Sequence, residues 1–217
     1  MKRHILCLGD SNTYGYSPEP ALAPACRFSE EERWAGRLQA ALGPDYLVIE
    51  EGLPGRTTVF DDPVEEGMSA LPYLYPCLMS HAPVELLVLM LGTNDVKERM
   101  GGNAFAIGKG LRRLVRKARS IPCWAGSPRI LVVAPLSLEE AVTRSPAAQE
   151  MGAGCVDKSR RLPGQFRAVA REEGCRFLDA NTLGLSYNAI DFMHLTRESH
   201  ARLAEVLAAQ IPTLLQP

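Results

Sequence analysis

Hydrophobic positions along this chain fall into two alternating patterns. Short aliphatic runs lie at residues 4–8, 46–49, 86–91, 130–134 and 176–178, and amphipathic segments with helical spacing lie between them. The runs do not alternate apolar with polar residues, which is typical of strands covered on both faces. Strands that alternate with helices predict a parallel sheet with right-handed crossovers. We expect a three-layer α/β/α sandwich with the flavodoxin-like strand order 2-1-3-4-5.

Capping residues indicate where several helices begin. Ser29 with Glu32 forms a capping-box pattern, Asn103 precedes an amphipathic stripe, and Thr196 can cap the last helix. Pro163 predicts the start of another helix, because proline is tolerated in the first turn. Residues 54–76 have no clear period and are rich in Pro, Gly and Asp, so we expect mainly a long loop with room for one short helix.

Length and charge narrow the functional classes. A chain of 217 residues favours one domain spanning residues 1–217. Its 24 Lys and Arg against 25 Asp and Glu leave no electrostatic footprint for a nucleic acid or an anionic membrane. Six scattered cysteines without a CxxC pair indicate free thiols in a reducing compartment. With no signal-peptide core and no long apolar span, we expect a cytoplasmic protein.

Polar, turn-forming segments follow four of the predicted strands. Ligands of open parallel sheets bind beyond the carboxyl ends of the strands, so we expect these segments to converge on one site. They are Gly9-Asp10-Ser11-Asn12-Thr13, the stretch 50–58, Gly92-Thr93-Asn94-Asp95 and Asp191-Phe192-Met193-His194.

Within these segments lie the residue types of nucleophilic catalysis. Ser11 is the candidate nucleophile and His194 the candidate base. Asp191, three residues earlier, can accept a hydrogen bond from Nδ1–H of His194 and leave Nε2 free. The amide of Asn94 and the backbone N–H of Gly55 are candidate donors to an oxyanion.

Each residue taken alone also has a plainer interpretation. Ser11 can serve as a helix cap, and His194 can be a surface residue at a helix entry. Asp10 is more typical of a loop organiser than of a catalyst, and we assign Asp10 and Asp95 supporting roles. These plainer interpretations become less convincing because we expect all four segments to lie at one edge of the sheet.

Other motifs do not compete with this site. The sequence has no G-x-S-x-G elbow, no P-loop, no dinucleotide fingerprint and no H-E-x-x-H, and we expect neither a metal nor an organic cofactor. His4 falls in a predicted strand, while His81 and His200 have no carboxylate at useful spacing.

The four segments together resemble the SGNH (GDSL-type) hydrolases. The letters of that name correspond to Ser11, Gly55, Asn94 and His194, in the family's order over residues 9–194. Register with the family pattern selects Gly55 rather than Gly52. The resemblance implies catalysis by Ser11, Asp191 and His194, with an oxyanion hole formed by Ser11, Gly55 and Asn94. Asn12 stands where the family pattern has Leu, and we expect a more polar pocket wall beside the nucleophile.

A narrower resemblance points to a bacterial arylesterase and acyltransferase branch. It rests on Ile49-Glu50-Glu51-Gly52, Arg56-Thr57-Thr58 and Asp61-Asp62-Pro63. The branch implies a serine esterase for short acyl or aryl esters, with a small-molecule ester as partner and with acyl transfer or perhydrolysis in some members. Two alternatives remain: a carbohydrate O-deacetylase of the same family, and a non-catalytic flavodoxin-like module that holds an anion at a helix N-terminus.

Oligomers are frequent in that branch, and the loops at 54–76 and 136–151 carry apolar side chains. We expect them to be buried against a second subunit of a homo-oligomer, which would narrow the acyl pocket. They are Val59, Phe60, Leu71, Tyr73, Leu74, Leu136, Leu138 and Val142.

Overall fold

The computed structural model describes residues 2–216. A parallel sheet of five strands forms the centre of the fold. Its order, β2-β1-β3-β4-β5, confirms the predicted order. The strands are β1 (Arg3–Gly9), β2 (Tyr46–Gly52), β3 (Val84–Met90), β4 (Ile130–Ala134) and β5 (Arg176–Asp179).

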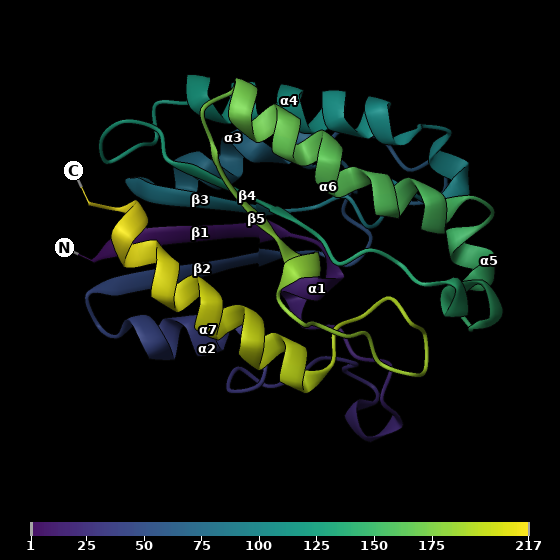
Figure 1. Cartoon of the computed structure of the whole chain (residues 1–217). Coiled ribbons are helices and arrows are strands. Elements are labelled where there is room, and N and C mark those ends of the chain that lie inside the picture. The colour runs from purple at the N-terminus through teal and green to yellow at the C-terminus, as the bar shows by residue number, and fades with distance from the viewer. Residues whose placement is uncertain (1, 217) are drawn as a thin grey trace.

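Helices cover both faces of the sheet, as the predicted sandwich requires (Figure 1). One layer contains α2 (Trp34–Leu42) and α7 (Arg197–Leu214). The opposite layer contains α3 (Ala70–Ser80), α4 (Ala104–Ser120) and α6 (Cys155–Glu172). The shorter elements are α1 (Ser11–Tyr14), α5 (Ala148–Met151) and the 3₁₀ turns η1 (Pro20–Leu22), η2 (Glu98–Met100), η3 (Glu140–Arg144) and η4 (Ala180–Thr182).

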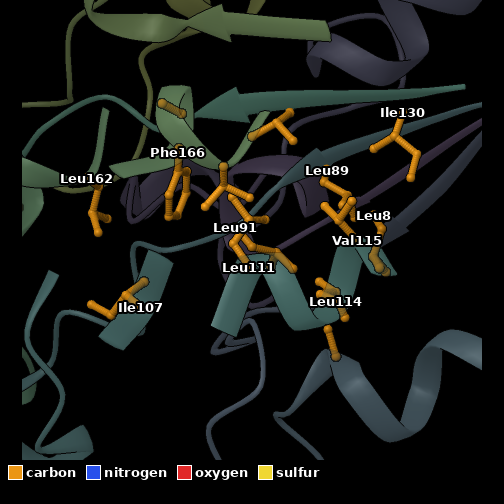
Figure 2. Close-up of a cluster of buried hydrophobic side chains, with 14 of the residues drawn as sticks. Leu8, Leu89, Leu91, Ile107, Leu111, Leu114, Val115, Ile130, Leu162 and Phe166 are labelled. Carbon is orange, nitrogen blue, oxygen red and sulfur yellow. The ribbon is translucent and has the colours of Figure 1, made fainter. Parts of the chain in front are cut away.

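Alternate side chains of each central strand enter different cores. Leu6 and Leu8 of β1 pack in the core beneath α4 and α6, part of which Figure 2 shows. Ile5 and Cys7 pack in the core beneath α2 and α7. Because both faces of the strand are buried from Ile5 onward, successive positions there are apolar, which explains the uninterrupted aliphatic run.

The capping-box prediction at Ser29 is wrong about where the helix starts. Glu32 does accept a hydrogen bond from Ser29 N–H at 3.0 Å, but residues 30–33 form a turn and α2 begins at Trp34. The cap comes from a residue far along the chain: His200 Nδ1 accepts from Trp34 N–H at 3.1 Å. By contrast, the caps predicted at Asn103 and Thr196 are confirmed.

The prediction at Pro163 also needs correction. Pro163 lies inside α6, which begins at Cys155. Proline lacks the N–H that would bond the carbonyl of Ser159, and Ser137 Oγ donates to that carbonyl instead, at 3.4 Å. The stretch 54–76 is mainly loop, as predicted, and the helix for which that prediction left room is α3, which begins at Ala70 and runs through Pro76. The helix forms because side chains at helical spacing are buried in the core; they are Ala70, Leu74, Cys77 and Leu78.

The apolar loop side chains do not provide the expected reason for an oligomer. Leu74, Leu138 and Val142 are buried within the chain's own core. The other predicted residues, apart from Tyr73, are partly buried against a core; they are Val59, Phe60, Leu71 and Leu136. A homo-oligomer therefore stays a prediction from family resemblance. In the stretch 2–216, no helix is both long enough and apolar enough to cross a membrane.

His200 predicts a loss of stability in acid. It is fully buried, and burial lowers its pKa from an ordinary 6.5 to about 3. As the pH falls, the His200 imidazole is therefore protonated in the unfolded chain before it is protonated in the folded chain. The contribution of neutral His200 to the free energy of unfolding is complete above pH 6.5 and is lost as the pH falls towards 3. Chemical denaturation should show wild type losing up to about 1.4 kcal/mol per pH unit more than His200→Asn over this range. If the free energies of unfolding of wild type and His200→Asn changed in parallel with pH, the lowered pKa of His200 would be contradicted.

Candidate active site

Ser11 stands at the first turn after β1, at the edge where the strands end. Asp10 caps α1 by accepting from Asn12 N–H at 2.9 Å, and the left-handed Gly15 (φ 82°) closes this one-turn helix. The helix lies against β2 because Gly52 has no side chain there: a Cβ would sit 2.2 Å from Tyr14 N. Gly52 therefore has a packing role.

Three side chains from opposite ends of the chain form a continuous hydrogen-bonded series. Ser11 Oγ lies 2.9 Å from His194 Nε2, and His194 Nδ1 lies 2.7 Å from Asp191 Oδ2. All three are buried. The other carboxylate oxygen, Oδ1, accepts from the backbone N–H groups of Met193 at 3.1 Å and His194 at 3.2 Å. The sequence-predicted nucleophile, base and acid are thus brought together in hydrogen-bonding order.

The environment of Asp191 favours its ionised form. Burial alone would raise the pKa of Asp191, but the hydrogen bond and charge of His194 outweigh it. Hydrogen bonds from Met193 N–H and Asn188 Nδ2 add to that effect, so the pKa lies below its ordinary value. A carboxylate in this state fixes the proton of His194 on Nδ1 and leaves Nε2 as an acceptor.

The predicted oxyanion donors line the same pocket. Gly55 (φ 86°) and Asn94 surround it together with Ser11 and His194. Asn94 Nδ2 donates to the carbonyl of Arg56 at 3.1 Å, which engages one of its two amide hydrogens. Within residues 2–216, neither Ser11 N–H nor Gly55 N–H is used in a protein hydrogen bond.

Asp10 and Asp95 lie beneath the site, fully buried. Burial raises the pKa of each to about 6, against hydrogen bonds that oppose the rise. Asp95 accepts from Thr58 N–H at 3.0 Å and from the Thr58 hydroxyl. It therefore ties the Gly55 segment to the Asn94 segment, which is a supporting position.

Sequence and structural comparisons show which family the chain belongs to. The profile of the GDSL-like lipase/acylhydrolase family matches residues 7–202. The chain belongs to this family. It is therefore a hydrolase of ester bonds, and the non-catalytic module is excluded.

Several solved structures resemble this GDSL-family hydrolase over nearly its whole length. A carbohydrate acetylesterase from Sinorhizobium meliloti is 35% identical, with 98% of this chain and 100% of that chain covered and a TM-score of 0.90. An aryl esterase from M. smegmatis is 35% identical over the same shares, with a TM-score of 0.89. A carbohydrate acetylesterase family member from Sinorhizobium meliloti is 37% identical over 98% and 99%, with a TM-score of 0.86. No curated protein sequence matched.

Asn12 departs from its expected place in this GDSL-family hydrolase. Its side chain does not line the pocket, so the prediction of a more polar wall is wrong. It is 4% exposed and faces the loop that carries His194, where it bonds Met193 O and Leu195 N.

The pocket is also lined by charged residues that the sequence did not predict. The pocket measures about 210 Å³, and Glu65, Lys97 and Glu150 lie among its lining residues. Lys97 is 3% exposed, and its Nζ lies 2.6 Å from Glu150 Oε1. Arg99 also contacts Glu150, at 2.6 Å. No sequence signal marks these pairs, because about fifty positions separate the partners.

The contacts of two further polar residues were also missed. Asn188 donates to Asp191 Oδ1 at 2.9 Å and accepts from Asp191 N–H at 3.0 Å, which shapes the turn before His194. A turn-forming asparagine three residues before Asp191 was the available signal. His81, dismissed for lack of a nearby carboxylate, lies 2.8 Å from Glu51 Oε1. In the part of the chain that the structure describes, no cluster of His, Cys, Asp and Glu could hold a metal ion.

Proposed function

We propose that this GDSL-family hydrolase cleaves short-chain acyl or aryl esters through an acyl-enzyme on Ser11. The observation that carries the proposal is the series Ser11–His194–Asp191, with separations of 2.9 and 2.7 Å. Ser11 Oγ attacks the carbonyl carbon while His194 Nε2 takes its proton. Asp191 stabilises the resulting imidazolium without taking the proton itself, in keeping with its lowered pKa.

The oxyanion that forms would accept hydrogen bonds from three donors. Ser11 N–H and Gly55 N–H have no other protein partner among the described residues, and Asn94 retains one amide hydrogen. His194 then gives the proton to the leaving alkoxide oxygen, which departs as an alcohol. Water, activated by His194, attacks the acyl carbon and releases the acid and free Ser11.

The pocket favours a small acyl group. Its volume of about 210 Å³ lies below the ~300–1,000 Å³ of typical ligand pockets. An alcohol that reaches the acyl-enzyme before water would give acyl transfer. Carbohydrate O-deacetylation is a second candidate, because Glu65, Lys97 and Glu150 at the pocket can hydrogen-bond hydroxyl groups. Cytoplasmic location and homo-oligomerisation stay predictions.

A substrate panel tests this proposal. We expect kcat/KM to be highest on p-nitrophenyl acetate to butyrate and to fall steeply towards ~C12–C16 esters. Acetylated sugars assayed beside aryl acetates separate the two candidates, and an added alcohol measures acyl transfer. Highest kcat/KM on the long-chain esters would contradict the short-acyl proposal.

Asn94→Ala should lower kcat by about 10²–10³ with a much smaller change in KM, because its hydrogen bond strengthens mainly in the transition state. Asn103→Ala is the matched control, since within residues 2–216 the Asn103 side chain accepts from Ala106 N–H at the start of α4 and forms no other hydrogen bond. That control should lose about 1 kcal/mol of stability and keep its kcat. A folded Asn94→Ala enzyme within threefold of the wild-type kcat would remove Asn94 from the oxyanion hole.

A further inference from the structure

We propose that Asn12 is a positioning residue that holds His194 against Ser11, an inference that rests on the catalytic roles proposed above. Its Nδ2 donates to Met193 O at 3.2 Å, and its Oδ1 accepts from Leu195 N–H at 2.9 Å. These two backbone groups belong to the residues immediately before and after His194. One side chain therefore fixes the base from both sides.

The backbone of Asn12 is itself held in place. Its N–H donates to Asp10 Oδ1 at 2.9 Å, and its carbonyl accepts from Trp34 Nε1 at 3.1 Å. Trp34 is buried in the core beneath α2 and α7. The amide side chain thus extends from a fixed point, one residue away from the nucleophile.

Other hydrogen bonds of the loop that carries His194 do not connect this loop to α1, the helix that begins with Ser11. Asn188 and Asp191 bond within the loop and set its internal shape. Ser145 Oγ donates to Asp191 O at 3.0 Å, which ties the loop to the region of η3. Apart from the Ser11–His194 contact, both side-chain hydrogen bonds between α1 and the loop in the described structure come from Asn12.

Only an amide meets both demands at this position. A donor and an acceptor are needed on one planar group of this size, and the surroundings are buried. Leucine, which the family pattern has here, offers neither, and aspartate lacks the donor. With leucine, the Met193 carbonyl and the Leu195 N–H lose these partners, and the loop loses its link to α1.

Kinetics of Asn12→Leu test the proposal. We expect kcat on p-nitrophenyl acetate and the rate constant for labelling by a fluorophosphonate both to fall about 10–100-fold. A displacement of His194 by about 1 Å is enough to cause a loss of rate of this size. KM should stay within about twofold. All measurements are made well below the melting temperature of each variant.

Asn181→Leu is the matched control. Asn181 forms the same kind of pair, with Nδ2 donating to Pro135 O at 3.2 Å and Oδ1 accepting from Ser137 N–H at 2.9 Å. These bonds flank no catalytic residue, so this variant should keep kcat and the labelling rate within about twofold. Equal losses in both asparagine variants would mean general loosening and would overturn the proposal.

Ser11→Ala keeps this test separate from that of the proposed function. If Ser11→Ala is inactive while Asn12→Leu labels and turns over like wild type, the positioning role is wrong and the catalytic roles stand. If Ser11→Ala stays active, the catalytic assignment itself fails. If Asn12→Leu does not fold, Asn12→Ala is measured instead, because the smaller side chain leaves room for water at the Met193 carbonyl and the Leu195 N–H. The same fall in kcat is expected for Asn12→Ala. A wild-type kcat in that variant would refute the positioning role.

Discussion

Replacing Ser11 with alanine is expected to lower kcat for short-chain ester hydrolysis by about 10⁴–10⁶-fold, because no acyl-enzyme can form. The side chain is small, and among the described residues its hydroxyl bonds His194 Nε2 alone, so the fold should be kept. Hydrolysis of p-nitrophenyl acetate measures the change, and circular dichroism verifies the fold.

Ser17→Ala is a suitable control for that loss. Ser17 is another buried serine in the same stretch, and its hydroxyl accepts from Glu19 N–H at 3.3 Å, away from the series of Ser11. It should keep kcat within about twofold. A folded Ser11→Ala enzyme with more than a tenth of the wild-type kcat would show that another group is the nucleophile.

Replacing Asp191 with asparagine is expected to lower kcat by about 10⁴-fold. Oδ1 accepts from the N–H groups of Met193 and His194 and from Asn188, so an amide oxygen will keep that position. The amide nitrogen then faces His194 Nδ1 and donates to it. The proton of the imidazole moves to Nε2, which can no longer take the proton of Ser11.

Asp179→Asn provides the comparison for Asp191→Asn. Asp179 also accepts from a backbone N–H two residues on, that of Asn181 at 3.0 Å, but in the described part of the chain it forms no hydrogen bond with a histidine. The kcat of the Asp179→Asn enzyme should match that of wild type. A kcat within tenfold of wild type in a folded Asp191→Asn enzyme would mean that the orientation of His194 does not depend on this carboxylate.

The sequence was sufficient to locate the catalytic candidates because their positions follow from sheet topology. Ser11 and Asn94 come shortly after strands β1 and β3, and parallel neighbours place their ends together. His194 and Asp191 share one turn, so their contact is local. Uninterrupted aliphatic runs likewise predicted buried strands, because both faces of the sheet are covered.

What the sequence did not predict depends on contacts between distant segments. Lys97 meets Glu150, and His200 caps a helix that begins at Trp34, through tertiary packing alone. Asn12 illustrates the same limit. Its neighbour Ser11 faces the pocket, yet the amide turns towards Met193 and Leu195, and no local pattern distinguishes these two directions.

Mapping the site of covalent attachment tests the central claim most directly. The enzyme is treated with a fluorophosphonate until activity is lost, digested, and examined by tandem mass spectrometry. A reactive Ser11 with His194 at 2.9 Å predicts one adduct per chain, on Ser11, in proportion to the loss of activity. Complete inhibition with Ser11 unmodified and the adduct on another residue would contradict the proposed mechanism.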